Sequence, residues 1–364
     1  MSGPRYVPLV LLALLGCAGA EAPAPAPTQL LRAPEFPPVP ALPDWSADPP
    51  SAAKMKLGAA LFFDQRLSGH GRTSCDPCHN HLTNFQDNLS GAVPDRSYPN
   101  DQPVLPRNTP SLFNIVYAPI LRWDGELKDL ADAMVFPFSE PNMNLGLDVP
   151  SAQHGLKQRL TTDFPGYVSE FQSAFAADIR SLPPEQVWRL AGRALAAFIR
   201  QAVSRDAAFD RWNAGDDSAM SPDAVRGLAL FRGSGRCVAC HSGPFFTDFS
   251  FHNLSTSPPR PDGTRADEGR ALISKQETDR GAFLTPTLRG AYDTWPYFHD
   301  GSVLSLRGVL RHLSSAAVTL DPNHDRLFDE NLVLSNSDID DLIEFLKALR
   351  GQPVSDISPP TTFP

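Results

Sequence analysis

Apolar residues recur every three or four positions in three stretches of the chain, which is the spacing of one face of an α-helix. The stretches cover residues 187–199, 221–231 and 337–349. Ser221 and Pro222 supply a capping serine and a first-turn proline for the second stretch. Ser337 opens the third, and Gly351 follows it as a left-handed stop. No strand-like alternation of useful length accompanies them, so the pattern predicts an all-α protein.

Prolines break this pattern throughout, because the sequence contains 37 of them. A proline removes a backbone N–H and fixes φ, so it ends helices and favours irregular segments. The helices are therefore expected to be joined by long irregular loops.

The first fifty residues differ in composition from the rest. One charge, Arg5, precedes an apolar run that ends in Leu14-Leu15-Gly16-Cys17. Such a run suits a signal-peptide core and is too short to span a bilayer. We predict a lipoprotein-type signal peptide at residues 1–16 with Cys17 lipidated, and an ordinary cleavage after Ala18 or Ala20 is the alternative. Residues 17–50 are predicted to be a Pro/Ala-rich tether, and either cleavage implies export to the periplasm.

Two Cys-X-X-Cys-His motifs carry the strongest chemical signal. They are Cys75–His79 and Cys237–His241, with Cys78 and Cys240 as the second thiols. Cysteines at this spacing attach one haem through two thioethers, and the following histidine ligates the iron. Zinc sites and thioredoxin-like redox sites use similar residues, but zinc needs four nearby ligands and the redox motif follows a strand. We therefore predict two covalently bound haems c, with His79 and His241 as proximal ligands.

The surroundings of the two motifs repeat. Gly58–Phe62 (GAALF) precedes the first motif and Gly227–Phe231 (GLALF) the second, while Phe85–Asp87 and Phe246–Asp248 follow them. A unit that occurs twice predicts two cytochrome-c-like haem domains. We assign residues 51–205 to an N-terminal domain, 206–352 to a C-terminal domain and 353–364 to a tail.

The formal net charge is −9. A mildly acidic chain argues against nucleic acid as a partner and is compatible with a basic electron-donor protein. The charge does not distinguish among other protein partners.

Several blocks of sequence resemble a known family. They are LGAALFFDQRLS (Leu57–Ser68), CDPCH, RNTPSLFN (Arg107–Asn114), RWDG (Arg122–Gly125), FLTPTLRG (Phe283–Gly290) and WPYFHDGS (Trp295–Ser302). In this order they resemble the bacterial dihaem cytochrome c peroxidases and the related MauG-type enzymes, over residues 57–351. The resemblance implies that the N-terminal haem binds hydrogen peroxide and the C-terminal haem passes electrons.

The resemblance also implies roles for individual residues. Trp123 matches the tryptophan between the haems and is expected to relay electrons, with simple packing as the alternative. Trp295 is expected to serve packing. A calcium ion between the haems would be held by Asn108, Thr294 and Pro296, whose amide and carbonyl oxygens suit it.

Three positions depart from the family pattern. Asp95 stands where peroxidases that need reductive activation have a distal histidine, so the first haem is expected to be open to peroxide. Glu140 is the candidate acid–base group for O–O cleavage. Leu313 stands where the second haem has a Met or Tyr ligand, so His312 is the candidate sixth ligand, with His252 and His324 as rivals.

Four functions remain open. The first is a peroxidase that reduces hydrogen peroxide with electrons from a cytochrome c, a cupredoxin or a similar donor. The second is a MauG-type enzyme that oxidises Trp or Tyr side chains of a partner protein. A non-catalytic dihaem electron carrier and a zinc-binding structural protein are the others, and the sequence leaves a homodimer open in each case.

Overall fold

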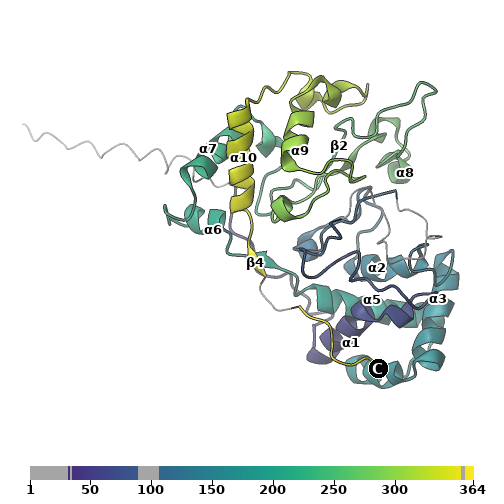
Figure 1. The fold of residues 1–364 in the computed structure, drawn as a ribbon. Coiled ribbons are helices and arrows are strands. Elements are labelled where there is room, and N and C mark those ends of the chain that lie inside the picture. The colour runs from purple at the N-terminus through teal and green to yellow at the C-terminus, as the bar shows by residue number, and fades with distance from the viewer. Residues whose placement is uncertain (1–31, 33–34, 89–105, 354–356) are drawn as a thin grey trace, which may run out of the picture.

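The computed structural model describes residue 32 and residues 35–88, 106–353 and 357–364. The chain forms two helical lobes, with α1–α5 in the lower lobe of Figure 1 and α6–α10 in the upper. The all-α prediction is confirmed, because the described strands form only two short pairs, β1 with β4 and β2 with β3. Within the described residues, no helix combines the length and the apolar character needed to cross a bilayer. The predicted signal peptide, Cys17 and Asp95 lie outside these residues.

The lower lobe is built from five α-helices and several shorter turns. Its elements are α1 (Ala52–Phe63), η2 (Gln65–Leu67), η3 (Ile115–Tyr117), α2 (Leu130–Val135), η4 (Phe136–Ser139), α3 (Val149–Gln158), the π-turn η5 (Arg159–Asp163), α4 (Gly166–Phe175) and α5 (Pro184–Ile199).

The upper lobe follows after β1. Its elements are β1 (Ser204–Arg205), α6 (Ala208–Asn213), α7 (Pro222–Arg232), η6 (Cys237–Ala239), β2 (Phe251–His252), α8 (Ala271–Ser274), η7 (Glu277–Asp279), β3 (Phe283–Leu284), η8 (Ala291–Asp293), α9 (Leu306–Leu313), η9 (Ala316–Thr319), η10 (Arg326–Phe328), α10 (Asn336–Ala348) and β4 (Gln352–Pro353).

Each lobe is organised by one close helix crossing, and a glycine of the sequence repeat lies at each crossing. A Cβ on Gly58 of α1 would lie 2.0 Å from the carbonyl oxygen of Ala194 in α5. A Cβ on Gly227 of α7 would lie 2.0 Å from the carbonyl oxygen of Asp341 in α10. Only glycine allows the backbones to approach this closely. The repeated GAALF and GLALF segments therefore form the same type of close helix–helix contact in the two domains.

An aromatic cluster beside each crossing repeats as well. Phe62 packs on Phe85 at a ring-centroid distance of 6.1 Å, and Phe231 packs on Phe246 at the same distance. All four rings are buried. The two lobes thus share a core in which the repeated helix rests on the loop that follows the haem motif.

The N-terminal segment 35–50, which we call the strap, corrects the prediction of a free tether. Phe36 is 1% exposed and belongs to the core of the upper lobe. Further along, Asp48 accepts hydrogen bonds from Lys54 and Arg193 of the lower lobe. The proline-rich composition misled the prediction because polyproline backbone can still anchor individual side chains. The described strap is therefore part of the folded body.

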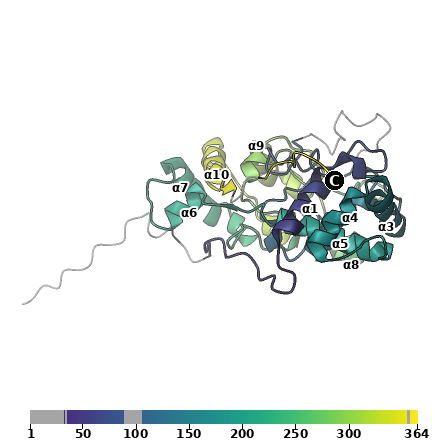
Figure 2. The ribbon, with the colours of Figure 1, turned by 90° about the horizontal axis from the view of Figure 1, so that it is seen from below.

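The C-terminal tail also packs. Arg66 donates a hydrogen bond from Nη2 to the carbonyl of Pro364 at 2.9 Å, and its guanidinium lies 5.7 Å from the ring of Phe363. Figure 2 accordingly shows the C-terminus beside α1 and α4 of the lower lobe. The last residues therefore return from the upper lobe to the lower lobe, beside α1.

The three predicted helices are present, with two local corrections. The third begins at Asn336, because Ser335 and not Ser337 caps it by accepting from the N–H of Asp338. Gly351 does not adopt a left-handed conformation; a Cβ there would lie 2.4 Å from Oγ of Ser204. A glycine is needed at position 351 because any side chain there would clash with Ser204 of β1, against which β4 pairs.

Candidate dihaem site

The first haem motif forms a turn that lies against the C-terminal end of α1. The N–H of Cys75 donates to the carbonyl of Phe62, so the motif is tied to the repeated helix. His79 donates from Nδ1 to the carbonyl of Phe85 at 3.2 Å, which leaves Nε2 as the nitrogen available to iron. Burial lowers the pKa of His79 to about 4, so the imidazole is neutral at physiological pH, as a metal ligand must be.

The second motif has the same geometry. His241 donates from Nδ1 to the carbonyl of Phe246 at 2.8 Å, and burial lowers its pKa. Beside it lies a cavity of about 350 Å³ whose lining includes Cys237, Cys240 and His241. The other lining side chains are mostly apolar. Paired thiols, an oriented neutral imidazole and an apolar cavity are the features that a c-type haem requires.

The residues that orient the two histidines explain the second part of the sequence repeat. Phe85 and Phe246 both adopt left-handed backbone conformations, with φ of 57° and 53°. This conformation turns each carbonyl toward the preceding histidine while the ring stays in the core. The sequence identified these aromatic positions as a repeat, but their hydrogen-bonding role lies in the main chain and is invisible in residue type.

Trp123 lies at the junction of the lobes. Its side chain lines the cavity beside His241, and Nε1 donates to the carbonyl of Asn108 at 2.8 Å. The carbonyl of Trp123 accepts from the N–H of Leu284 in β3. Asn108 therefore holds the ring and β3 of the upper lobe holds the main chain of the same residue, while the role of Trp123 between the haems stays a prediction.

Asn108 connects this tryptophan to the first haem motif. Its Oδ1 accepts from Nε2 of Gln86 at 3.0 Å, and Gln86 directly follows the Phe85 that orients His79. Its Nδ2 donates to the carbonyl of Pro296 at 2.7 Å in the upper lobe. Asn108 is 4% exposed and Gln86 is 1% exposed. One buried amide network therefore joins both halves of the site.

The residues predicted to hold calcium meet at this network. Asn108, Thr294 and Pro296 all line the cavity. In the structure, however, the Asn108 amide N–H satisfies the Pro296 carbonyl, and the Asn108 oxygen is satisfied by Gln86. Calcium would need both oxygens to face the ion, so the Asn108 amide would have to turn over to bind it.

An ion-pair cluster that the sequence did not identify fixes the same junction. Arg107 donates from Nη1 to Asp124 at 2.6 Å and from Nε to Asp267 at 2.7 Å. Burial by itself lowers the pKa of Arg107, but the two carboxylates together outweigh it, so the net shift of this pKa is upward. Asp124 follows Trp123 in the chain, and Asp267 belongs to the upper lobe. One guanidinium therefore links the loop Arg122–Gly125, which carries Trp123, to the upper lobe. Asp267 carries no motif, so only the fold could reveal it.

Glu140, the acid–base candidate, also contacts the loop that carries Trp123. Nη2 of Arg122 donates to its carboxylate at 2.5 Å, and the Glu140 side chain is 24% exposed. The adjacent chain packs toward the first haem motif, since the N–H of Gly69 donates to the carbonyl of Met143. The structure thus ties the carboxylate to Arg122, the residue before Trp123, and its catalytic role stays a prediction.

His312 does not face the cavity, which corrects its prediction as sixth ligand. Its Nε2 lies 2.7 Å from the carbonyl of Leu254. The residues of α9 that line the cavity include Leu306, Val309, Leu310 and Leu313. They form a single face, and His312 lies off that face because each helical residue turns the chain by about 100°.

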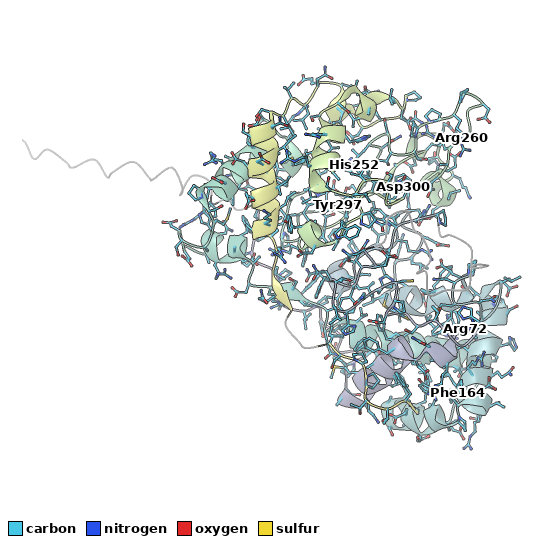
Figure 3. All side chains as sticks on the ribbon, viewed as in Figure 1. Arg72, Phe164, His252, Arg260, Tyr297 and Asp300 are labelled. Atoms are coloured by element: carbon cyan, nitrogen blue, oxygen red, sulfur yellow. The ribbon has the colours of Figure 1, made fainter. Side chains whose placement is uncertain are left out.

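The rival histidines are held by carboxylates. His324 bonds to Asp329 and does not line the cavity. His252 and Tyr297, both labelled in Figure 3, line the cavity in the upper lobe. His299 lines it too, stacked on Phe283 at 3.6 Å.

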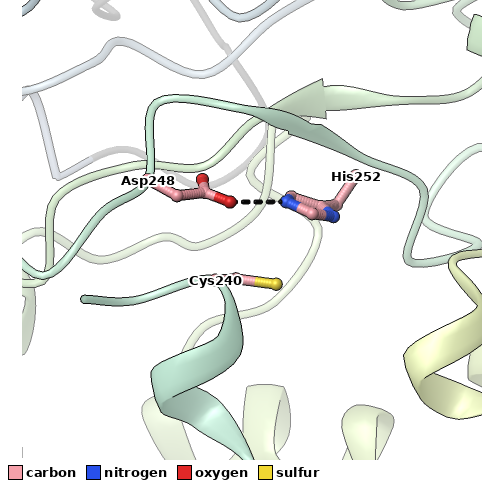
Figure 4. Close-up of side chains that lie close together, drawn as sticks. All are labelled: Cys240, Asp248 and His252. Atoms are coloured by element: carbon pink, nitrogen blue, oxygen red, sulfur yellow. Dashed lines mark hydrogen bonds and ion pairs between the residues drawn. The ribbon is translucent and has the colours of Figure 1, made fainter.

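His252 belongs to a compact cluster with Cys240 and Asp248, whose polar atoms lie within 4.8 Å of one another (Figure 4). It bonds to Asp248 at 2.9 Å and to Asp325 at 2.5 Å. While Cys240 is a free thiol, its hydrogen bond with His252 and those of the two carboxylates raise the pKa of His252 to about 10. Since Cys240 belongs to a haem-attachment motif, we interpret the group as an ion-pair cluster beside that motif and not as a separate metal site.

Trp295, which is expected to serve packing, is only partly covered in the structure. Its exposed fraction is 41%. Its neighbours Thr294 and Pro296 line the cavity.

Comparison with known proteins identifies the class. Residues 52–218 match the model of the di-haem cytochrome c peroxidase family. The chain is 35% identical over 317 residues to the methylamine utilization protein MauG of Methylorubrum extorquens, covering 86% of this chain and 83% of that protein. It is 29% identical to the cytochrome c551 peroxidase of Nitrosomonas europaea, covering 83% and 81%. The chain belongs to the family of dihaem cytochrome c peroxidases and MauG proteins.

Solved structures agree. A MauG-like protein associated with microbial copper homeostasis superposes with a TM-score of 0.71 and 26% identity, covering 88% of this chain and 95% of that one. The diheme peroxidase BthA of Burkholderia thailandensis has the same fold, with a TM-score of 0.67 and 22% identity, covering 89% and 95%. The predictions of two c-type haems and of a peroxidase-type oxidoreductase are confirmed at the level of the family.

Proposed function

We propose that the protein reduces hydrogen peroxide to water with electrons from a small redox protein such as a cytochrome c. Each turnover consumes one peroxide, two electrons and two protons and yields two waters. A haem at His79 would supply the peroxide chemistry, and a haem at His241 would store and pass electrons. We further propose that the protein works in the periplasm after export, with Cys17 as a lipid anchor.

The observation that carries this proposal is the placement of Trp123. The ring lines the cavity of the second motif and is hydrogen-bonded to Asn108. Asn108 in turn contacts Gln86, beside the residue that orients His79. An oxidisable indole held rigidly between two haem sites suits electron transfer from one to the other. Two neighbouring groups would support Trp123 in this role. Arg107 and its two carboxylates would hold the loop that carries Trp123, and Glu140 would act as the acid–base group.

The decisive experiment follows oxidation of reduced cytochrome c on addition of peroxide, using the holoprotein and a Trp123→Phe variant. The expected result is rapid oxidation by the natural protein and a loss of at least about tenfold in the variant, which corresponds to about 1.4 kcal/mol of barrier. Phenylalanine keeps the ring but not the indole N–H or its ease of oxidation. Failure of the natural protein to oxidise any of several cytochromes or cupredoxins would contradict the proposal.

A second function has specific support. The relative from Methylorubrum extorquens is a MauG, and Leu313 stands in the cavity wall where no methionine is present. On this alternative the same machinery withdraws electrons from Trp or Tyr side chains of a partner protein. Mass changes on a co-purified or genetically adjacent secreted partner after peroxide treatment would favour it over the cytochrome c reaction.

Calcium binding remains part of the proposal. The Asn108 amide N–H and the Pro296 carbonyl already share one buried hydrogen bond, and turning the amide over would direct both oxygens toward an ion. Titration of calcium into chelator-treated holoprotein, followed by calorimetry, tests this. An Asn108→Asp variant should bind more tightly, and equal heats for both proteins and for buffer would contradict a site here.

A further inference from the structure

Trp295 stands in the chain between two residues that line the cavity beside the second haem motif. These residues are Thr294 and Pro296, whereas 41% of Trp295 itself is exposed. The other tryptophan beside the cavity, Trp123, lies at the junction of the lobes. Trp295 is therefore a solvent-exposed tryptophan whose two chain neighbours border the cavity.

The same residue is joined to Trp123 by a short series of bonds. Nε1 of Trp123 donates to the carbonyl of Asn108 at 2.8 Å. Nδ2 of Asn108 donates to the carbonyl of Pro296 at 2.7 Å. Pro296 follows Trp295 in the chain. Two hydrogen bonds and the covalent links between them thus connect Trp123 to the exposed Trp295.

Tyr117 offers the competing route to the surface. Its ring stacks on Phe245 at 4.5 Å, and Phe245 lines the cavity. However, its hydroxyl donates to the carbonyl of Pro40 and accepts from Arg205. Oxidised tyrosine must lose its proton to a base, and a carbonyl beside a guanidinium is a poor base. Tryptophan can lose an electron without this requirement, so Trp295 is the better site.

We propose that Trp295 is the point at which single electrons from a protein partner enter the molecule, an inference that rests on the proposed peroxidase function. In each step Trp295 gives one electron to the peroxide-oxidised centre and takes one from the reduced partner. Two such steps supply the two electrons that, with two protons, convert one peroxide to two waters. The partner is a small redox protein that covers the indole with an apolar patch around its own redox group, since tryptophan is favoured at the centre of protein interfaces.

The test uses three holoprotein variants. Trp295→Phe keeps an aromatic ring that is hard to oxidise, and Trp295→Tyr keeps an oxidisable one. Tyr117→Phe is the matched control on the competing route. Each protein is first treated with peroxide without any donor, and oxygen adducts are mapped by peptide mass spectrometry. Steady-state oxidation of reduced cytochrome c is then measured, together with the rate at which peroxide changes the haem spectrum.

The proposal predicts adducts on Trp295 in the natural protein, because a hole that no donor fills stays on the indole. It predicts that Trp295→Phe lowers kcat/KM for cytochrome c at least about tenfold. Trp295→Tyr should recover part of that loss, whereas Tyr117→Phe and the spectral rate with peroxide should stay unchanged. A purely structural role would not be rescued by tyrosine.

Unmodified Trp295 together with a natural rate in Trp295→Phe overturns the proposal while leaving the peroxidase function intact. The proposed function fails in a different way, when the natural protein does not oxidise the donor at all. The adduct mapping needs no donor, so it still decides whether oxidising equivalents reach Trp295.

Discussion

Replacing Phe36 by alanine tests whether the strap is structural. The ring is 1% exposed and stacks on Phe246 at 4.8 Å. It also packs edge-on against Phe209 at 5.8 Å. Truncating a buried phenylalanine costs about 3–5 kcal/mol, and these aromatic pairs favour the upper half of that range. Since domains are stable by only about 5–15 kcal/mol, the upper lobe should lose about a quarter or more of its stability.

The same variant should change the second haem. Phe246 orients His241 through its carbonyl, and the carbonyl of Glu35 accepts from the N–H of Gly243 in the same loop. Loosening this loop weakens the hydrogen bond that makes the imidazole a strong donor to iron, so the potential of the second haem should rise. The first haem, which Phe85 orients, should keep its potential.

Thermal unfolding of the holoprotein followed by circular dichroism, and a spectroelectrochemical titration of both haems, measure these effects. The unfolding midpoint should fall by roughly 10 °C or more, given about 2–4 °C per kcal/mol in proteins of this size. Leu42→Ala is the matched control, because Leu42 lies in the strap and is 47% exposed. Equal midpoints and potentials for the natural protein and both variants would refute a structural strap.

Three further outcomes follow from the packing and the charges. Gly227→Ala should destabilise the upper lobe by about 1–3 kcal/mol in urea unfolding despite alanine's higher helix propensity, because its Cβ meets a carbonyl of Asp341; an unchanged midpoint would contradict the crossing. The hydrogen bond from Arg193 chiefly lowers the pKa of Asp48. Asp48→Asn should therefore cost about 1–3 kcal/mol at pH 7. This difference should shrink progressively as the pH falls below about 4, where the unfolded carboxyl takes up its proton, and it should vanish only below the lowered pKa of the folded carboxyl. Arg107→Met should cost about 3–5 kcal/mol by leaving two part-buried carboxylates unpaired, and denaturant unfolding at neutral pH that shows less than 1 kcal/mol would contradict the buried cluster.

The sequence alone determined the chemistry that is written in residue type and spacing. The two Cys-X-X-Cys-His motifs specify haem attachment because thioether and imidazole ligation need those atoms at that spacing. The repeated glycine-containing helices predicted two related domains, and the apolar periodicity predicted α5, α7 and α10 within a few residues. The sequence placed the start of α10 at Ser337, whereas Ser335 caps the helix, because both serines suit a helix start and only the backbone direction separates them.

The tertiary structure decided what depends on direction and on distant partners. Phe85 and Phe246 orient the histidines through main-chain carbonyls, whose direction residue type does not encode. Asp267 reaches Arg107 across the interface, and its place there follows only from the packing of the lobes. His312 failed as a ligand because a helix turn presents Leu313 to the cavity in its place. Composition likewise could not reveal that a proline-rich strap buries Phe36 in the second core, since burial depends on the surface that receives a side chain.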